Sequence, residues 1–211
     1  MNDILILSGW GMPPIITNGN SKNSKNNYLY FDYLQQENLT NVANNLRGKK
    51  FSKVIGWSLG GQLACYLITE EIITAKELIL ISVAYDFNDN NFYKKFINDF
   101  AAKPELALQR FRSLVAYGDS NFKAILKEIP AINYKKYKYL SYWLEMLGIL
   151  TISQMDLTKL PPAITILHGE NDVINDISQA EKLSIKLPTA QQIIIQKVGH
   201  GLFWRLNEMI I

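Results

Sequence analysis

The 211-residue sequence has one cysteine and only two histidines. A single cysteine excludes an internal disulfide and any zinc site built from several cysteines. It agrees with a reducing compartment, where thiols persist, and we expect Cys65 to be packed in the core. Two histidines leave few candidates for chemistry that needs an imidazole.

The chain also has little net charge and no long apolar run. Its formal net charge is +3, and no block of Lys and Arg with interleaved aromatics occurs, so we expect no nucleic-acid partner. No apolar run approaches the roughly 18 residues that cross a bilayer. The start, M-N-D-I-L-I-L-S-G-W-G, carries an acidic residue where a secretory signal is basic. We therefore expect a cytoplasmic protein without a membrane partner.

What the sequence does contain is a series of short apolar runs, each followed by turn residues. Runs without alternation predict strands buried on both faces, as in a parallel sheet covered by helices. These runs are Ile4–Leu7, Tyr28–Phe31, Val54–Ile55, Leu78–Val83, Ala163–Leu167 and Ile193–Ile195. Helical patterns lie between or after them at Gln62–Glu71, Ser178–Lys186 and Leu202–Ile210. The alternation predicts an α/β fold with right-handed crossovers.

Residues 84–156 break this rhythm, because they hold amphipathic helical patterns and no convincing strand. We predict one domain over residues 1–211, with a core of 1–83 and 157–211 and a helical lid at about 84–156. Pro161 and Pro162 end the lid and restart the sheet. The Asn, Ser and Lys stretch at 18–27 predicts a flexible loop from its composition.

The stretch G56-W57-S58-L59-G60 matches G-x-S-x-G, with a strand pattern before it and a helical pattern after it. In a nucleophile elbow the serine occupies a strained turn, and the flanking glycines avoid collisions with the neighbouring strand and helix. The alternative is a glycine-rich turn with an incidental serine. The context favours Ser58 as a nucleophile.

A serine hydroxyl is a weak nucleophile until a base takes its proton, so the hypothesis requires a histidine, late in the chain for this fold. His200 follows the last predicted strand in V198-G199-H200-G201. His168 lies in the turn after an earlier strand and precedes the candidate acids, which makes it the weaker alternative. We predict His200 as the base.

The base must be oriented by a carboxylate that follows another strand end, in the order Ser, Asp or Glu, His. Asp172, in G169-E170-N171-D172, lies just past the predicted strand Ala163–Leu167. Glu170 and Asp176 are nearby competitors and are more typical of solvated loop acids. We predict Asp172 as the acid.

Acyl transfer also needs donors for a tetrahedral oxyanion. In this architecture they are the backbone N–H after the nucleophile and one from a loop after an early strand. Leu59 supplies the first. The turn S8-G9-W10-G11 directly follows the strand Ile4–Leu7, and the N–H of Trp10 is the candidate for the second. Alternatively, this turn merely links strand to loop.

With these residues in place, the sequence resembles the α/β-hydrolases, and within them the pimeloyl-acyl-carrier-protein methyl ester esterases of biotin synthesis, of the BioH and BioG types. The shared stretches are G9-W10-G11-M12, G56-W57-S58-L59-G60-G61, Q109-R110-F111-R112-S113-L114, L144-E145-M146-L147, D156-L157, G169-E170-N171-D172 and G199-H200-G201-L202-F203. The resemblance implies the α/β-hydrolase fold, with helices on both faces of a mostly parallel sheet. It also implies a serine carboxylesterase that removes the methyl ester from a pimeloyl chain on acyl carrier protein. It implies no metal and no organic cofactor.

In that family, basic lid residues contact the acidic carrier protein, and Arg110 and Arg112 fall on the matching segment. Residues 84–140 carry ten Lys and Arg against six Asp and Glu, so the positive surplus lies in the predicted lid. Lys123 and Lys127, one helical turn apart, are expected to join the same face.

The resemblance has departures. Ser8 stands where many relatives have histidine, and the region 13–33 is compressed, as in the BioG type; both bear on the subtype and on the oxyanion loop. Four aromatic residues are candidate walls for an aliphatic acyl chain, although such positions are more often core. They are Trp10, Trp57, Phe111 and Trp143.

Two other readings of the sequence stay open. One keeps the three catalytic residues but changes the substrate, giving a thioesterase, a general short-chain esterase or a carbon–carbon bond hydrolase. The other is a non-catalytic binding module that retains the elbow for packing. The presence of all three residue types in the expected order argues against the second.

Overall fold

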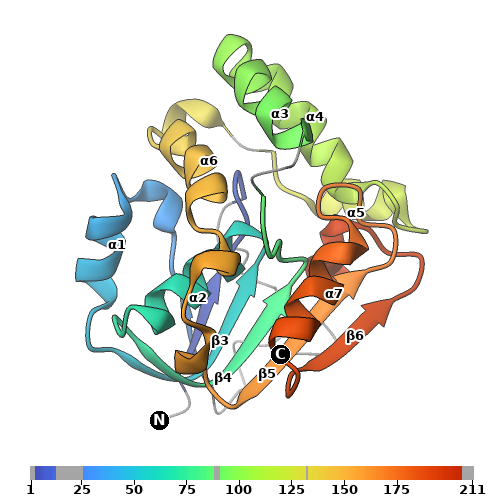
Figure 1. Ribbon diagram of the computed structural model, residues 1–211. Helices are drawn as coiled ribbons and strands as arrows, with labels where there is room; N and C mark the ends of the chain where they lie inside the picture. Colours follow the sequence, from blue (N-terminus) through green and yellow to red (C-terminus); the bar gives the residue numbers. More distant parts are fainter. Residues whose placement is uncertain (1–2, 13–25, 88–90, 132, 206–211) are drawn as a thin grey trace.

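The computed structural model describes residues 3–12, 26–87, 91–131 and 133–205. Six strands of this part of the chain form one sheet in the order β2-β1-β3-β4-β5-β6, and every neighbouring pair is parallel. The strands are β1 (Asp3–Leu7), β2 (Asn27–Tyr30), β3 (Lys50–Trp57), β4 (Thr74–Ile81), β5 (Ala163–Gly169) and β6 (Gln191–Ile195). Figure 1 shows them as a twisted sheet across the middle of the molecule. All six predicted strands are therefore confirmed, in a parallel sheet.

The central strands are buried on both faces, as their unbroken apolar runs predict. The last four residues of β1, β3, β4 and β5 are buried without alternation. The register pairs Leu7 with Gly56, Trp57 with Ile81 and Ile81 with Leu167, so the carboxyl ends of β1, β3, β4 and β5 meet at one edge. Loops after these strands are brought together there, which is where ligands bind in open parallel sheets.

Both faces of the sheet are covered. Helices α2 (Leu59–Thr69) and α7 (Ile177–Lys186) lie in front of it in Figure 1, and α1 (Leu39–Leu46) lies at the side of β2 and β3. Gly56 contacts the start of α2, and successive strand residues point to opposite faces, so Trp57 points away from α2. Its ring packs against Phe203 and Trp204 of the 3-10 segment η5 (His200–Arg205).

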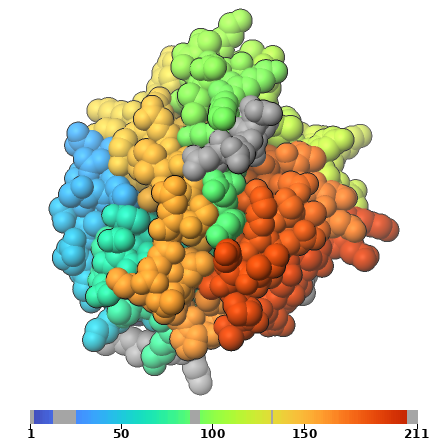
Figure 2. All heavy atoms as spheres, viewed as in Figure 1, coloured from blue at the N-terminus to red at the C-terminus, as the bar shows by residue number. Residues whose placement is uncertain are grey.

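The region between β4 and β5 is helical, as predicted, and in its described residues it contains no strand. It consists of α3 (Asn91–Ala102), α4 (Pro104–Ala116), α5 (Phe122–Glu128), α6 (Leu140–Ile149) and the 3-10 turns η2 (Tyr134–Lys136) and η3 (Ile152–Gln154), with η4 (Leu157–Lys159) before β5. We call residues 84–156 the helical insertion. Figures 1 and 2 show α3 and α4 projecting above the sheet, whereas α6 runs down beside α2.

Helix α6 of the insertion is bonded directly to the core. The buried Gln62 side chain of α2 donates to the carbonyl oxygens of Leu147 and Leu150, at 3.2 and 3.1 Å, which ties α6 to the core. The whole stretch was predicted as a lid above a core of 1–83 and 157–211. Its helical character is confirmed, and its division from the core as a lid stays a prediction.

Other details refine the sequence analysis. Within the predicted terminal helix Leu202–Ile210, residues 202–205 belong to a 3-10 segment that begins at His200 and ends at Arg205, and the rest of that prediction lies outside the described residues. The predicted loop at 18–27 falls largely outside it as well. No helix among the described residues has the length and apolar character needed to cross a membrane. Cys65 is buried on α2, and burial raises the pKa of its thiol to about 12, which keeps it protonated and inert.

Candidate active site

Ser58 occupies a strained turn between β3 and α2. Its φ of 52° and ψ of −124° lie in a region that L-residues rarely adopt, and such strain concentrates at functional sites. The turn is held on both sides, because the Ser58 N–H donates to Ile81 O at 2.9 Å and its carbonyl accepts from Gly61 N at 2.9 Å. This is the geometry of a nucleophile elbow.

The glycines around the serine are needed for close approach of backbone to backbone. A Cβ atom on Gly56 would lie 2.5 Å from Gly61 Cα, so strand and helix touch at this point. A Cβ atom on Gly60 would overlap the carbonyl oxygens of Leu7 and Ser8. The start of α2 therefore lies directly against the end of β1, beside the turn that was predicted to supply an oxyanion donor.

Asp172 and His200, 28 residues apart, form a buried hydrogen bond. His200 Nδ1 lies 2.8 Å from Asp172 Oδ2. The other carboxylate oxygen, Oδ1, accepts from the backbone N–H groups of Ile174 and Asn175, each at 2.9 Å. These three bonds fix the carboxylate and orient the imidazole. Because Nδ1 carries the shared proton, Nε2 is left as the basic nitrogen of neutral His200.

The basic nitrogen of His200 is not hydrogen-bonded to Ser58 in this structure. His200 Nε2 is buried and has no hydrogen-bond partner among the described residues, so Ser58 Oγ does not bond to it here. Trp57, the neighbour of Ser58 in the chain, contacts His200. Its indole Nε1 donates to His200 O at 3.0 Å, and the centroids of its ring and the imidazole are 5.4 Å apart. In unliganded enzymes the bond between nucleophile and base is often long and tightens when substrate binds.

The alternative residues from the sequence analysis have structural partners. His168 is fully buried, and its Nε2 bonds to Asn175 O at 2.8 Å. Glu170 is exposed and accepts from the Lys197 N–H at 3.2 Å. Asp176 caps α7, where it accepts from the Ser178 N–H at 3.0 Å, and this bond lowers the pKa of the Asp176 carboxyl. Of the candidate acids, Asp172 is the one that contacts a histidine in this way.

The two predicted oxyanion donors lie on neighbouring segments. Leu59 is the first residue of α2, so its N–H has no acceptor within the helix and is available to a ligand. Trp10 belongs to the turn after β1 that contacts Gly60. A Cβ atom on the adjacent Gly9 would lie 2.8 Å from the Trp57 ring, so this turn also packs on the residue that precedes Ser58.

The four aromatic residues predicted to line the substrate site have different environments. Trp10 is 1% exposed; its indole donates to Leu140 O at 2.9 Å, and its ring packs edge to face on Phe96, Phe100 and Phe111. Trp57 and Trp143 are fully buried, the latter donating to Gln36 O at 2.9 Å. Phe111 alone of the four lines a cavity formed by the described residues, so its predicted contact with substrate has the most direct structural support.

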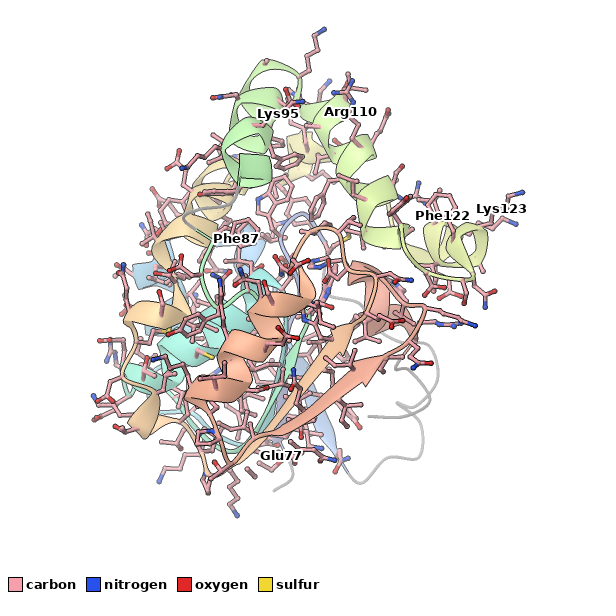
Figure 3. The ribbon with its side chains drawn as sticks, turned by 45° about the vertical axis from the view of Figure 1, so that its right-hand side comes forward. Glu77, Phe87, Lys95, Arg110, Phe122 and Lys123 are labelled. Atoms are coloured by element: carbon pink, nitrogen blue, oxygen red, sulfur yellow. The ribbon has the colours of Figure 1, made fainter. Side chains whose placement is uncertain are left out.

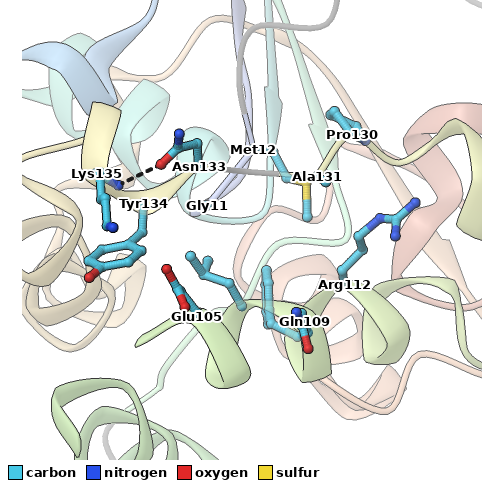
Figure 4. Close-up of a pocket in the computed structure, with 12 residues that line it drawn as sticks. Gly11, Met12, Glu105, Gln109, Arg112, Pro130, Ala131, Asn133, Tyr134 and Lys135 are labelled. Atoms are coloured by element: carbon cyan, nitrogen blue, oxygen red, sulfur yellow. Dashed lines mark hydrogen bonds between the residues drawn. The ribbon is translucent and has the colours of Figure 1, made fainter. Parts of the chain in front are cut away.

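That cavity, of about 540 Å³, lies between the turn after β1 and the insertion. Figure 4 shows Glu105, Gln109 and Arg112 of α4 on one side, and Gly11 and Met12 across from them together with Pro130, Ala131, Asn133, Tyr134 and Lys135. Its lining mixes apolar and polar side chains: Met12, Leu108, Phe111, Pro130 and Ala131, with Glu105, Gln109, Arg112, Asn133, Tyr134 and Lys135. Such a cavity suits a ligand with an aliphatic part and a polar end.

The four predicted basic contacts are not equivalent. Arg110 is exposed, with its guanidinium 4.0 Å from Asp99 Oδ2, and Lys123 and Lys127 are exposed on α5. Arg112 instead turns inward, where it donates to the carbonyl oxygens of Ile129, at 2.7 Å, and Leu126. These carbonyls end α5, so the guanidinium is already used within the insertion.

The insertion also contacts the loops that carry the acid and the histidine. In the connection between α4 and α5, Ser120 N donates to Lys197 O at 2.9 Å, and Gly118 O accepts from Asn171 Nδ2 at 3.1 Å. The sequence did not indicate these contacts, because each joins loops far apart in the chain. Among the described residues, no three His, Cys, Asp or Glu side chains gather as a metal site would require.

Comparisons with known proteins agree with this architecture. No family model matches the sequence. The chain is 24% identical over 182 residues, 81% of its length and 71% of the relative, to a pimeloyl-[acyl-carrier protein] methyl ester esterase of Nitrosomonas europaea. It is 27% identical over 168 residues, 71% of its length and 67% of the relative, to the protein of the same name from Aromatoleum aromaticum.

Solved structures with the same fold are esterases and related hydrolases. An esterase from Exiguobacterium antarcticum matches with a TM-score of 0.68 at 17% identity, over 99% of this chain and 88% of that one. BioG from Haemophilus influenzae matches with a TM-score of 0.67 at 17% identity, over 98% and 92%. The chain therefore has the α/β-hydrolase fold, and it is similar in sequence to ester hydrolases of that fold.

Proposed function

We propose that this ester hydrolase uses Ser58 as nucleophile, His200 as general base and acid, and Asp172 to orient and stabilise the imidazole. The observation that carries the proposal is the buried 2.8 Å bond between His200 Nδ1 and Asp172 Oδ2, at the same sheet edge as the strained Ser58 turn. The N–H groups of Leu59 and Trp10 are proposed to bind the oxyanion.

The protonation states of Ser58 and His200 define the steps of the proposed reaction. His200 Nε2 takes the proton of the Ser58 hydroxyl as Oγ attacks the ester carbonyl, and the imidazolium is stabilised by Asp172. The tetrahedral oxyanion accepts hydrogen bonds from the two backbone N–H groups. On collapse, His200 returns the proton to the leaving alcohol and an acyl ester of Ser58 remains. Water, deprotonated by His200, then hydrolyses that ester and restores the hydroxyl.

We further propose that the substrate is the methyl ester of a pimeloyl chain carried on acyl carrier protein. Support comes from the names of the sequence relatives and from the cavity next to the turn after β1, whose mixed apolar and polar lining suits an acyl chain with a polar end. Methanol and a free carboxylate are the products, and the thioester to the carrier stays intact.

The proposed docking face for the carrier is a groove of about 490 Å³ on the outer side of α4 and α5. Leu106, Tyr117 and Phe122 give it an apolar floor, and they are 38%, 57% and 36% exposed. Arg110 lines it, and Figure 3 shows Lys123 beside Phe122 at the surface. An apolar floor with a basic rim suits an acidic, amphipathic helical partner. We assign the contact to Arg110, Lys123 and Lys127 rather than to the inward-turned Arg112.

The assignment of the nucleophile is tested with Ser58→Ala on short p-nitrophenyl esters. We expect kcat to fall by about 10⁴-fold or more, since the nucleophile of a catalytic triad is lost, while the thermal unfolding midpoint stays within a few degrees. The matched control is Ser52→Ala at the other end of β3, where the hydroxyl donates to Asp3 O at 2.9 Å. Activity that survives in Ser58→Ala would refute the assignment.

The substrate is tested by mass spectrometry of methyl pimeloyl-acyl carrier protein after incubation with the enzyme. The proposal requires loss of one methyl group with the acyl chain still on the carrier. Release of the whole acyl chain would instead identify a thioesterase. Labelling by a fluorophosphonate, which needs an activated serine, separates both enzymes from a non-catalytic binding module.

A further inference from the structure

The turn that carries the proposed oxyanion donor Trp10 is closed by two hydrogen bonds to one residue. Met12 N donates to Gly9 O at 3.2 Å, and the Ser8 hydroxyl donates to Met12 O at 2.8 Å. Ser8 is 2% exposed and Met12 is 2% exposed, so water does not compete for these bonds. The turn from Ser8 to Met12 is therefore defined by its own polar groups.

These bonds fix the direction of the Trp10 N–H. The carbonyl of Gly9 and the N–H of Trp10 belong to one peptide group, which is planar and trans, so the two point in opposite directions. Because Gly9 O is directed at Met12 N, the Trp10 N–H is directed away from the turn. A change that loosens the closure would let this peptide rotate and would turn the donor away from an oxyanion.

A second contact holds the turn from outside. The Tyr33 hydroxyl, from the 3-10 turn η1 (Tyr33–Gln35), donates to Ser8 O at 2.9 Å. Tyr33 is fully buried, and its ring packs edge to face on Trp143 with centroids 4.8 Å apart. Burial raises the pKa of the Tyr33 phenol well above its usual value, so it stays protonated and remains a donor.

The same Ser8 carbonyl faces the elbow. A Cβ atom on Gly60 would overlap it, so Ser8 O lies between the Tyr33 hydroxyl and the first turn of α2. That turn begins with Leu59, the other proposed donor. Tyr33 thus holds the end of β1 at contact distance from the helix, and the spacing of the two N–H groups depends on this contact.

We propose that Tyr33 and Ser8 are positioning residues for the oxyanion site: Tyr33 fixes where the turn after β1 lies, and Ser8 fixes how the Trp10 N–H points. This inference rests on the proposed function of Ser58 and deepens it. Both hydroxyls are buried and already donate within the protein, so we expect them to act on the barrier of the reaction more than on substrate binding.

The test compares Tyr33→Phe and Ser8→Ala with the unmodified enzyme on a p-nitrophenyl ester. Each variant removes one hydroxyl and leaves the packing volume almost unchanged. We expect kcat to fall by about 10-fold to 100-fold, less than the 10²–10³-fold lost when an oxyanion donor is removed, with KM within about threefold. The matched control is Tyr93→Phe, which removes a hydroxyl that donates to the Glu145 carbonyl of α6, at 3.1 Å, and should leave kcat unchanged.

A second measurement separates positioning from general loss of stability. Addition of the Ser58 hydroxyl to an aryl trifluoromethyl ketone gives a hemiketal oxyanion that needs the same donors. We expect the inhibition constant of this probe to rise by the same factor by which kcat/KM falls. Variants with unchanged kcat and unchanged inhibition constant, or with losses explained wholly by a smaller folded fraction, would overturn the inference.

The two proposals fail in different ways. If Ser58→Ala keeps its activity, the proposed function is wrong, and the N–H groups of Leu59 and Trp10 have no oxyanion to bind. If Ser58→Ala is inactive while Tyr33→Phe and Ser8→Ala match the unmodified enzyme, Ser58 is still the nucleophile. Only the positioning role of Tyr33 and Ser8 is then wrong.

Discussion

His168 and His200 approach the same carboxylate oxygen of Asp172: Oδ2 lies 3.6 Å from His168 Nε2 and 2.8 Å from His200 Nδ1. Both histidine side chains are fully buried. His168 Nε2 also bonds to Asn175 O at 2.8 Å, and because a carbonyl only accepts, this nitrogen carries the proton. The other ring nitrogen of His168, Nδ1, is buried and has no hydrogen-bond partner among the described residues, as suits a neutral imidazole beside the acid of the proposed triad.

Burial is the largest influence on the pKa of His168 and lowers it below 6.5. The carboxylates of Asp172 and Asp176 and the bond to Asn175 O oppose this shift, and His200 adds to it. A base whose pKa is depressed on folding contributes stability above its unfolded pKa, and this contribution is lost as the pH falls toward the folded pKa. Below about pH 6.5, His168 binds a proton in the unfolded chain but not in the folded protein.

We therefore predict that the free energy of unfolding falls between about pH 7 and pH 5 more steeply in the unmodified protein than in His168→Gln. One proton contributes at most about 1.4 kcal/mol per pH unit. Glutamine can still donate to Asn175 O but does not titrate. Urea unfolding at pH 7.5, 6.5 and 5.5 measures the slopes, and equal slopes for the two proteins would contradict the role given to His168.

The contact of Gly60 with the end of β1 predicts a large cost for a single methyl group. In Gly60→Ala the new Cβ would overlap the carbonyl oxygens of Leu7 and Ser8, and backbone atoms cannot move aside without shifting strand or helix. We expect a loss of about 1–3 kcal/mol or more in the free energy of unfolding, together with a loss of esterase activity in the protein that remains folded.

The control for this prediction is Gly48→Ala, at a position with φ of +76° where a Cβ atom meets nothing within 4 Å. There only the left-handed backbone is penalised, by roughly 1–2 kcal/mol, and activity should be unchanged. Chemical unfolding curves and p-nitrophenyl ester rates measure both effects. A Gly60→Ala enzyme with normal stability and normal kcat would mean that the elbow tolerates a looser fit.

Much of this fold could be predicted because local sequence and burial agree. Ile4–Leu7 is an unbroken apolar run, and it forms the strand β1, which is buried on both faces. The stretch around Ser58 specifies its own turn, since Gly56 and Gly60 permit contacts that any side chain would block. Ser58, Asp172 and His200, which follow β3, β5 and β6, are then brought toward one edge, because parallel strands place their carboxyl ends there.

The rest depends on contacts between distant segments, which periodicity does not encode. Nothing in the sequence around Tyr33 indicates that its hydroxyl donates to the carbonyl oxygen of Ser8, 25 residues away. Arg112 and Arg110 are two residues apart in one amphipathic pattern, and only packing decides that the first turns inward to α5. Likewise, the contact of Ser120 with Lys197 joins the insertion to the loop before His200, and it involves only backbone atoms.

The difference between these two arginines gives a prediction about the carrier protein. Arg110→Glu combined with Lys123→Glu reverses two exposed charges beside the groove on α4 and α5 and leaves the active site untouched. We expect KM for methyl pimeloyl-acyl carrier protein to rise by about fivefold or more, given roughly 0.5–1 kcal/mol for each exposed charge pair. The increase should shrink in high salt, and kcat/KM for a p-nitrophenyl ester should stay unchanged.

Arg112→Gln should behave in the opposite way. It removes the guanidinium that donates to Ile129 O at 2.7 Å, so we expect a lower unfolding midpoint and similar losses with carrier-bound and small esters. Lys186→Glu, an exposed charge reversal in the last turn of α7, is the control for a general effect of net charge. If the double charge reversal lowers kcat/KM equally for both substrates, or if Lys186→Glu has the same effect on the carrier substrate, the groove is not where the carrier docks.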